Sequence, residues 1–293
     1  MTEYRVLHVT RYDYSDPVSL CQNVAHLKPR DWPAQRCDRS AVAVTPAPAV
    51  VEDRRDYFGN PATYFTVQEP HRALTVTAAH RIAVRPAAPP DPGDTPAWEG
   101  VRDAAPFDRS ADGLDAFQYS FDSRYAAAAP EFAAYAAESF APGRPVLAAA
   151  LELTARIHAG FAYDPRATTV ATPVREVFAA KRGVCQDFAH LQIACLRSVG
   201  LPARYVSGYL STVPPPGKPR LVGADATHAW MSVYCGPRFG WIDLDPTNDV
   251  IPGDRHVLLA WGRDYDDVSP VKGVVLGGGQ HTVTVSVDVA PVG

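Results

Sequence analysis

The sequence is divided by a segment that can be neither a helix nor a central strand. Five prolines fall between Pro86 and Pro96. Proline lacks a backbone N–H and has a fixed φ, so proline-rich stretches form stiff, extended spacers instead of helices or sheets. The 293-residue chain is long enough for two domains of ordinary size. We therefore predict an N-terminal domain over residues 1–86, a proline-rich linker over 87–112 and a C-terminal domain over 113–293.

The N-terminal part has the pattern of a β domain. Its runs of Val, Thr, Tyr and Phe alternate partly with polar residues, and clusters of Gly, Pro and Asn separate them, as is typical of short antiparallel strands. Strands are predicted at Tyr4–Tyr14, Arg39–Val44, Ala62–Val67 and Ala73–Val84. We expect a small, mostly-β, sandwich-like domain. Its four histidines are dispersed and indicate no ligand site.

The C-terminal part begins with helices and ends with strands. Proline opens two helical patterns, at Pro130–Ser139 and Pro145–Ala159, and a third covers Cys185–Ser198. Strand-like runs follow at Ala203–Leu210, His228–Tyr234, Gly240–Asp245, His256–Ala260 and Thr282–Val289. Helices grouped before strands predict an α+β fold rather than alternating βαβ units. Gly277–Gly279 precedes no helical pattern and lacks a Lys-Ser/Thr pair, so we predict a turn and not a phosphate-binding loop.

Charge, hydropathy and cysteine content exclude several classes of protein. Lys and Arg number 28 against 32 Asp and Glu, a net charge of −4, and without a basic run no nucleic-acid partner is expected. No apolar stretch reaches the ~18 residues of a membrane span, and the N-terminus shows no secretory signal. Five dispersed cysteines without a C-x-x-C pair are a poor disulfide framework. We therefore predict a cytoplasmic protein with free thiols.

Cys185 is the thiol whose position favours reactivity. An apolar stripe at Val184, Phe188, Leu191 and Cys195 has helical spacing, so Cys185 lies in the first turn of a helix. The N-terminus of a helix carries a partial positive charge and free N–H groups, which stabilise an anion. A thiol is nucleophilic as the thiolate. The position therefore indicates a nucleophile.

Two further motifs carry a histidine and two carboxylates. His228 lies in Thr-His-Ala-Trp, and Asp243 and Asp245 lie in Trp-Ile-Asp-Leu-Asp-Pro-Thr, on neighbouring predicted strands. A histidine beside a thiol can form a thiolate–imidazolium pair, and a carboxylate behind the histidine fixes its tautomer. Asp243 and Asp245 are two residues apart and share one face of a strand. Spacing alone does not choose between them.

The neighbouring polar residues and cysteines have structural interpretations. Cys195 and Cys235 fit the role of small buried side chains. Asp187 lies in the first helical turn, where a carboxylate favours the helix dipole, and we prefer this role to a substrate contact. His190 lies on a different face of its helix from Cys185 and is a poor base. Zinc sites usually carry paired ligands at close spacing, so no metal is expected.

Together the three motifs resemble those of the bacterial transglutaminase-like family, within the papain-like cysteine-enzyme superfamily. The similarity rests on GVCQDFAHL, HAW and GWIDLDPTN, and the segments LHVTRYDYSD and DYFGNPATYF are similar to the β domain that precedes the catalytic domain in that family. The resemblance implies a papain-like α+β core with the cysteine-bearing helix packed on an antiparallel sheet. It also implies Cys185 as the nucleophile, His228 as general base and acid, and Asp245, the carboxylate before Pro-Thr, as the orienting group.

The same resemblance implies a reaction class without a cofactor. Tyr163 is predicted to supply a side-chain donor of the oxyanion hole, beside the backbone N–H of Cys185, and Trp230 to pack over His228. We predict hydrolysis of a peptide or protein amide through a thioester, because water is the default acceptor and no calcium motif is present. Two alternatives stay open: transglutaminase-type transfer to an amine, and a catalytically idle papain-like scaffold that binds protein.

Overall fold

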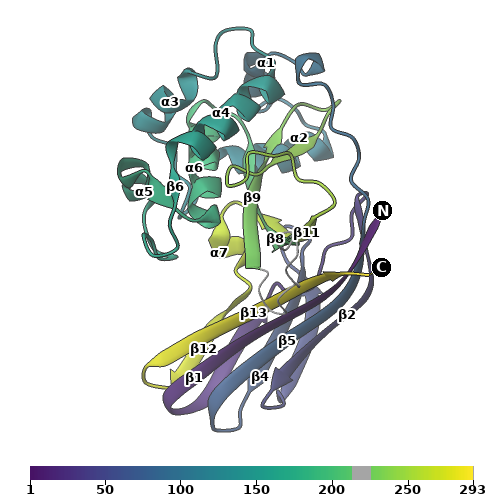
Figure 1. Ribbon diagram of the computed structural model, residues 1–293, viewed down its shortest axis with the longest axis vertical. Helices are drawn as coiled ribbons and strands as arrows, with labels where there is room; N and C mark the ends of the chain where they lie inside the picture. Colours follow the sequence, from purple (N-terminus) through teal and green to yellow (C-terminus); the bar gives the residue numbers. More distant parts are fainter. Residues whose placement is uncertain (213–225, 293) are drawn as a thin grey trace, which may run out of the picture.

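The protein has a β-rich half and a mixed helical and sheet half. The computed structural model describes residues 1–212 and 226–292. Strands from both ends of the sequence form the lower half in Figure 1, and helices packed against a second sheet form the upper half. The mixed α+β architecture predicted from the sequence is confirmed.

A long first strand organises the β-rich half. Strand β1 (Thr2–Ala25) pairs along its first part with β5 (His71–Val84) on one side and β13 (His281–Pro291) on the other. Along its second part it pairs with β4 (Pro61–Val67) and β12 (Val271–Gly277). All these pairings are antiparallel, so one strand is shared by both halves of a curled sheet.

Two outer strands complete this seven-stranded sheet. Strand β2 (Gln35–Thr45) pairs with β5, and β3 (Val50–Arg55) pairs with β4. A small buried core lies inside the curled sheet, with Cys21, Phe65 and Leu74 among its members. The curled sheet therefore has a hydrophobic core of its own, separate from the core that it shares with the helical half.

The end of the chain belongs to this sheet, which corrects the predicted C-terminal domain of residues 113–293. Strands β12 and β13 occupy the free side of β1, and the sequence had assigned them to the other domain. Pairing between the two ends of a chain cannot be read from a local pattern. Alternation predicts a strand but does not identify the strand with which it pairs. Gly277–Gly279 is the irregular step between β12 and β13, where all three glycines have positive φ. A Cβ on Gly277 would lie 2.6 Å from the carbonyl oxygen of Pro17.

The predicted linker, residues 87–112, is extended only in its first part. A 3-10 turn (η1, Pro92–Asp94) is followed by helix α1 (Trp98–Ala104), and α2 begins at Ala111. Proline at the start of η1 is compatible with a first helical turn. The proline-rich composition therefore fits the extended first part of the segment, but it concealed helix α1, which begins two residues after Pro96.

Helices cover one side of the second sheet. After α1, they are α2 (Ala111–Phe117), the 3-10 turn η2 (Gln118–Ser120), α3 (Pro130–Ala137), α4 (Val146–Gly160), α5 (Val174–Ala180), α6 (Cys185–Ser198) and α7 (Tyr265–Val268). Helix α6 is almost wholly buried and contacts α3, α4 and α5 as well as the sheet. None of the helices in the described ranges has the length and apolarity needed to cross a bilayer.

The second sheet has four antiparallel strands in the order β10-β9-β8-β11. They are β8 (Ala203–Leu210), β9 (Ala226–Tyr234), β10 (Trp241–Leu244) and β11 (His256–Gly262). Ala229, Met231 and Val233 of β9 join the core that contains α6. Trp230 belongs to a separate cluster on the opposite face. Because side chains alternate along a strand, His228 lies on the same face as Trp230.

Two amide side chains from the β-rich half bind the outer edge of the second sheet. Gln35 donates to the carbonyl of Leu258 and accepts from its N–H, both at 2.8 Å. Asn60 forms the same pair of bonds with Trp261, at 2.8 and 3.0 Å. Each amide replaces a peptide group of a neighbouring strand, so the β-rich half satisfies an edge that would otherwise be open.

Candidate active site

Helix α6 presents Cys185 at its first turn. The preceding strand β7 (Arg182–Gly183) pairs in parallel with β6 (Ala162–Tyr163). Asp187 accepts hydrogen bonds from the backbone N–H of Val184 at 2.9 Å and from the hydroxyl of Thr168 at 2.6 Å. Burial raises the pKa of Asp187, although both hydrogen bonds oppose the rise. Asp187 therefore fixes the start of the helix, as the sequence indicated.

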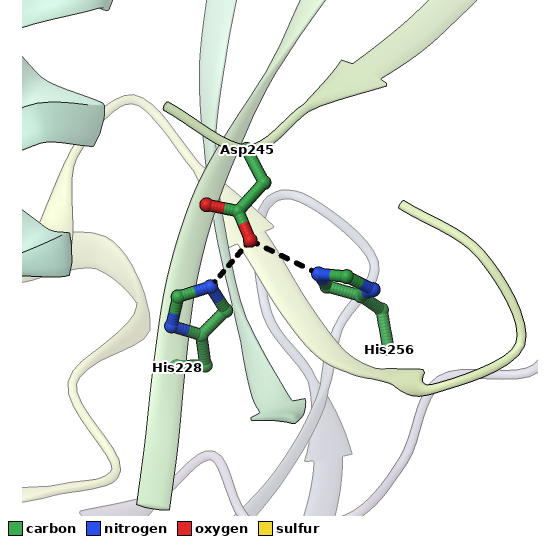
Figure 2. Close-up of side chains that lie close together, drawn as sticks. All are labelled: His228, Asp245 and His256. Atoms are coloured by element: carbon green, nitrogen blue, oxygen red, sulfur yellow. Dashed lines mark hydrogen bonds and ion pairs between the residues drawn. The ribbon is translucent and has the colours of Figure 1, made fainter. Parts of the chain in front are cut away.

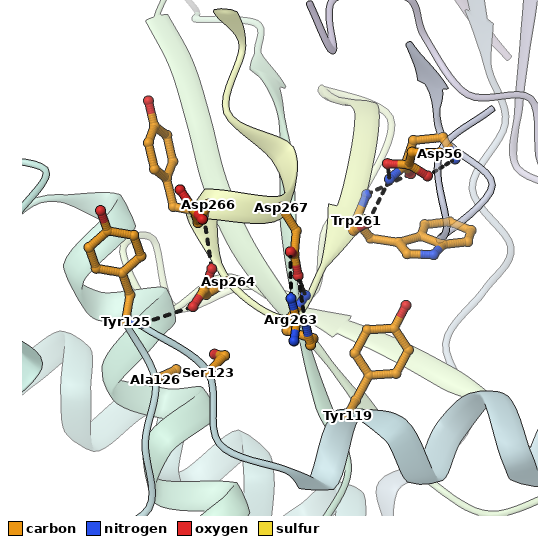
Figure 3. A network of polar contacts seen from close by, with 12 residues as sticks. Asp56, Tyr119, Ser123, Tyr125, Ala126, Trp261, Arg263, Asp264, Asp266 and Asp267 are labelled. Atoms are coloured by element: carbon orange, nitrogen blue, oxygen red, sulfur yellow. Dashed lines mark hydrogen bonds and ion pairs between the residues drawn. The ribbon is translucent and has the colours of Figure 1, made fainter. Parts of the chain in front are cut away.

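The other end of α6 is held by a buried arginine. Arg197 donates to the carbonyl oxygens of Tyr119, Ala126, Ala203 and Arg263 and to the hydroxyl of Ser123. The same segments are joined to α7: Asp264 accepts from the N–H groups of Tyr125 and Asp266, and Arg263 pairs with Asp267, as Figure 3 shows. A helix fixed at both ends gives the Cys185 sulfur a defined position.

His228 lies between a thiol and a carboxylate. Its Nε2 is 2.7 Å from Oδ2 of Asp245, which follows β10 directly (Figure 2). Cys185 also lies within interaction range of the ring, where its hydrogen bonding and charge raise the pKa of His228. Because Asp245 takes Nε2, the nitrogen left for the sulfur is Nδ1. Cys185, His228 and Asp245, predicted from three separate motifs, are thus brought together.

Five N–H groups converge on Asp245. Oδ2 accepts from His228, from Nε2 of His256 at 3.1 Å and from Nδ2 of Asn248 at 2.7 Å. Oδ1 accepts from the backbone N–H groups of Thr247 and Asn248. Burial alone raises the pKa of Asp245, but these bonds and the charge of His228 outweigh burial and hold the pKa far below its usual value. The carboxylate therefore stays ionised although it is fully buried.

The charge on the histidine follows from its two partners. Burial lowers the pKa of His228, but the hydrogen bonds and charges of Asp245 and Cys185 more than compensate and raise it to about 10. The imidazolium form of His228 is consequently favoured at neutral pH. Cys185 is only partly buried, whereas Cys21, Cys195 and Cys235 are buried, so the thiol beside His228 is open to a substrate.

Trp230 lies beside the His228–Asp245 pair and is not part of it. Its ring centroid is 6.0 Å from that of His228 and 5.3 Å from that of His256. The indole N–H donates to Asp243 at 3.0 Å. Asp243 thus shares the sheet face of Asp245 but binds Trp230 and Ser232 instead of His228.

Tyr163 lies close to the thiol and is open to solvent. Its side chain is 57% exposed, and β6–β7 pairing places it opposite Gly183. Burial, and then the charge of Cys185, raise the pKa of Tyr163. Tyr205 lies on the inner side of the same thiol, where burial and then the Cys185 charge raise its pKa well above the ordinary value. No role was predicted for Tyr205 from the sequence.

His190 has a structural role. Its Nε2 accepts from the backbone N–H of Tyr265 at 3.1 Å, and its ring stacks on Tyr125. Burial, together with the charge of Arg197, lowers the pKa of His190 to about 3. A neutral ring engaged in this way is not available as a base for Cys185.

Sequence reasoning missed two groups at Asp245: His256 and Asn248. Asn248 reaches back from the turn after β10, and His256 begins β11. The turn is closed by reciprocal backbone bonds between Asp245 and Val250. Asn248 belongs to the Asp-Pro-Thr-Asn run and could have been found there, but His256 has no motif around it.

His228, Asp245 and His256 also form a group of potential metal ligands, with ligand atoms within 4.8 Å of one another. The Asp245 carboxylate already accepts five hydrogen bonds. An ion would have to displace several of them from a carboxylate with no exposed surface. The observed contacts therefore fit a hydrogen-bonded catalytic group better than a metal site.

Comparisons with known proteins agree with this geometry. The family model for the transglutaminase-like superfamily matches residues 133–246, and the model for the bacterial transglutaminase-like N-terminal region matches residues 4–83. A Mycobacterium tuberculosis protein of uncharacterised function is 44% identical over 98% of this chain and 92% of its own length. The chain belongs to the transglutaminase-like superfamily. The family resemblance inferred from the motifs is therefore confirmed.

Other relatives cover the chain to different extents. A Mycobacterium leprae protein, also uncharacterised, is 34% identical over 99% of both chains. The protein-glutamine gamma-glutamyltransferase of Pseudomonas aeruginosa is 35% identical, but over only 34% of this chain and 16% of its own length. A solved structure of a candidate cysteine protease from Cytophaga hutchinsonii aligns with a TM-score of 0.77 over all of this chain and 91% of its own, at 20% identity. This last likeness confirms the papain-like fold.

Proposed function

We propose that this protein hydrolyses an amide bond through a thioester on Cys185. The observation that carries the proposal is the position of His228, which is bonded to the buried carboxylate of Asp245 and lies close enough to Cys185 for the thiol to raise its pKa. This order of groups supplies a nucleophile, a proton carrier and a group that orients the carrier. The five free cysteines fit a reducing compartment, in agreement with the cytoplasmic location we propose.

In the first half-reaction the Cys185 thiolate attacks the carbonyl carbon of the amide. A carbon–sulfur bond forms, and the carbonyl oxygen takes up negative charge. When the tetrahedral intermediate collapses, the carbon–nitrogen bond breaks and His228 gives its Nδ1 proton to the leaving nitrogen. The products of this step are an amine and a thioester on Cys185, and His228 is neutral.

In the second half-reaction neutral His228 accepts a proton from water. The resulting hydroxide attacks the thioester carbon, the carbon–sulfur bond breaks, and a carboxylic acid leaves. Cys185 returns to the thiolate and His228 to the imidazolium. Asp245 keeps its charge throughout and stabilises the imidazolium.

Two donors are available for the oxyanion. The first N–H groups of a helix have no intrahelical acceptor, and those at the start of α6 lie at Cys185. The Tyr163 hydroxyl is the side-chain donor that we propose, because the tyrosine lies beside the thiol and is exposed to an incoming substrate.

Transfer to an amine is the second candidate function. It is favoured by the similarity of 108 residues to a protein-glutamine gamma-glutamyltransferase. The two reactions share the thioester and differ only in the acceptor. Water is present at high concentration without a binding site, whereas an amine acceptor requires one, so we retain hydrolysis as the proposal.

The two candidates are separated by following both products of one substrate. The protein is incubated with a glutamine-containing peptide and with casein, with and without dansylcadaverine as the amine. We expect free carboxylate and released ammonia or amine, with little dye incorporated, and no product with Cys185→Ala. Dye incorporation that exceeds hydrolysis would overturn the hydrolase proposal. Equal alkylation rates for all five thiols at pH 6 would contradict an activated nucleophile and favour the idle scaffold.

A further inference from the structure

His256 is a second histidine bound to the catalytic carboxylate. It begins β11, where it pairs with Leu210 of β8, and its side chain is buried. Its Nε2 lies 3.1 Å from Oδ2 of Asp245, the same oxygen that binds His228 (Figure 2). Two imidazoles from different strands therefore share one carboxylate oxygen.

Local contacts determine which nitrogen of His256 carries the proton. The backbone N–H of Gly253 points at Nδ1 from 3.4 Å, so Nδ1 acts as an acceptor. The backbone N–H of His256 donates to the carbonyl of Gly253 at 3.1 Å, which closes a tight turn around the ring. With Nδ1 as acceptor, the proton of the neutral ring is on Nε2 and is donated to Asp245.

The ring of His256 is also fixed by packing. Trp230 contacts it edge to face at 5.3 Å. His256, Trp230 and Asp243 are among the residues that line a cavity of about 690 Å³ between the β-rich half and the second sheet. The ring is thus held by hydrogen bonds at both nitrogens and lies at the wall of this cavity.

We propose that His256 is a positioning residue that holds the Asp245 carboxylate in place and limits how strongly it binds the proton of His228. The proposal rests on the function proposed above. A carboxylate oxygen that accepts from His256 and Asn248 shares its negative charge with them. When one donor is removed, more of that charge acts on the remaining bond to His228.

This arrangement affects the acid step of the reaction. His228 must give up its proton to the leaving nitrogen, and a general acid that is too weak gives the proton up slowly. By sharing the charge of Asp245, His256 keeps His228 from becoming too weak an acid. Among the described residues, the titratable side chains that face His228 are Cys185 of α6, Asp245 after β10 and His256 of β11, whose ring centroid is 5.9 Å away.

The test compares His256→Phe, which keeps a ring but removes the donor, with His256→Gln, whose amide N–H can replace Nε2–H. Iodoacetate labelling of Cys185 is followed against pH by peptide mass analysis. Because the reagent is an anion, its rate falls when the imidazolium of His228 loses its proton. This readout needs no substrate, so it remains informative even if the proposed hydrolysis is not found.

We expect His256→Phe to move the alkaline limb of the labelling profile up by about one pH unit. We also expect kcat to fall roughly 10- to 100-fold with little change in KM. His256→Gln should restore most of both properties. His190→Phe is the matched control, because it also removes a buried histidine bond without touching Asp245. The proposal is overturned if the alkaline limb of the labelling profile stays in place or moves to lower pH in His256→Phe. It is also overturned if His256→Gln restores neither the limb nor kcat.

Discussion

Two aspartates on one face of the second sheet differ in burial and in partners: Asp245 is fully buried, and Asp243 is partly buried. Asp245 accepts hydrogen bonds from two histidines and an asparagine. Asp243, two residues earlier, accepts from the indole of Trp230 and the hydroxyl of Ser232. The two carboxylates therefore have the same chemistry but differ in burial and lie in separate networks.

The difference between them lies in the kind of charge that each carboxylate meets. Asp243 interacts electrostatically with Arg204, a buried guanidinium whose pKa is lowered by burial and raised by Asp243. Asp245 faces His228, whose proton can move and whose pKa is also raised by Cys185. A carboxylate next to a guanidinium, which keeps its charge, stabilises structure, whereas one next to a titrating ring beside a nucleophile can assist catalysis.

Among the substitutions considered, loss of the proposed nucleophile should have the largest effect on activity. Cys185→Ala removes the atom that forms the thioester, so we expect kcat/KM to fall by on the order of 10⁴–10⁶. The side chain is only partly buried, and the thermal unfolding midpoint should stay within a few degrees of the wild type. Measuring hydrolysis and thermal unfolding of the same preparation checks both expectations. Residual turnover above about one per cent would show that another group reacts.

Asp245→Asn should have the second largest effect. The amide nitrogen of asparagine cannot accept the proton of His228, so the imidazole can adopt the wrong tautomer. This loss costs about 10⁴ in a serine triad. A thiolate–imidazolium pair is partly held by its own charges, and we expect a loss of roughly 10²–10³ in kcat/KM. A loss of less than tenfold would remove Asp245 from the catalytic group.

The free energy of unfolding should depend on pH through the contact between His228 and Asp245. In the folded protein the pKa of His228 is raised to about 10, against about 6.5 in an unfolded chain. Because the pKa is higher in the folded state, protonation of His228 stabilises the folded protein. This stabilisation is complete below about pH 6.5 and is lost as the pH rises through about 10. The free energy of unfolding from urea titrations should therefore fall between these values. A profile equally steep in Asp245→Asn would assign the fall to other groups.

The sequence was most informative where chemistry depends on residue type. Cys185, His228 and Asp245 each lie in a run of residues with a distinct pattern, and the structure brings the three side chains together. Helix α6 also starts at Cys185 as predicted. The apolar stripe gives its helical spacing, and Gly200 and Pro202 mark its end.

The sequence was least informative where a residue acts through a distant partner. His256 reaches Asp245 only because β11 lies in the same sheet and the turn around Gly253 aims its ring. The pairing of β12 and β13 with β1 joins residues roughly 250–290 positions apart, and alternation along a strand does not identify the neighbouring strand. Both features depend on tertiary contacts that local periodicity does not record.

Asp243→Asn should have the smallest effect on activity and a clear effect on stability. Asparagine keeps one oxygen for Trp230 or Ser232 but loses the second acceptor and the charge that faces Arg204. A buried group left without its partner costs about 1–3 kcal/mol of stability. Because Trp230 packs beside both His228 and His256, a small shift of its ring reaches the triad only indirectly. We therefore expect kcat/KM within about fivefold of the wild type, since the lost bond is absent from the reacting groups.

The comparison of Asp243→Asn with Asp245→Asn decides which carboxylate orients His228. Both variants exchange one oxygen for a nitrogen on the same sheet face, so their size and position are matched. We expect Asp243→Asn to lower the unfolding midpoint and to leave kcat/KM within about fivefold of the wild type. We expect Asp245→Asn to lower kcat/KM by roughly 10²–10³. If Asp243→Asn causes the greater loss of kcat/KM in folded protein, the charge that supports His228 comes through Trp230 and Arg204, and the assignment of the third triad residue to Asp245 is wrong.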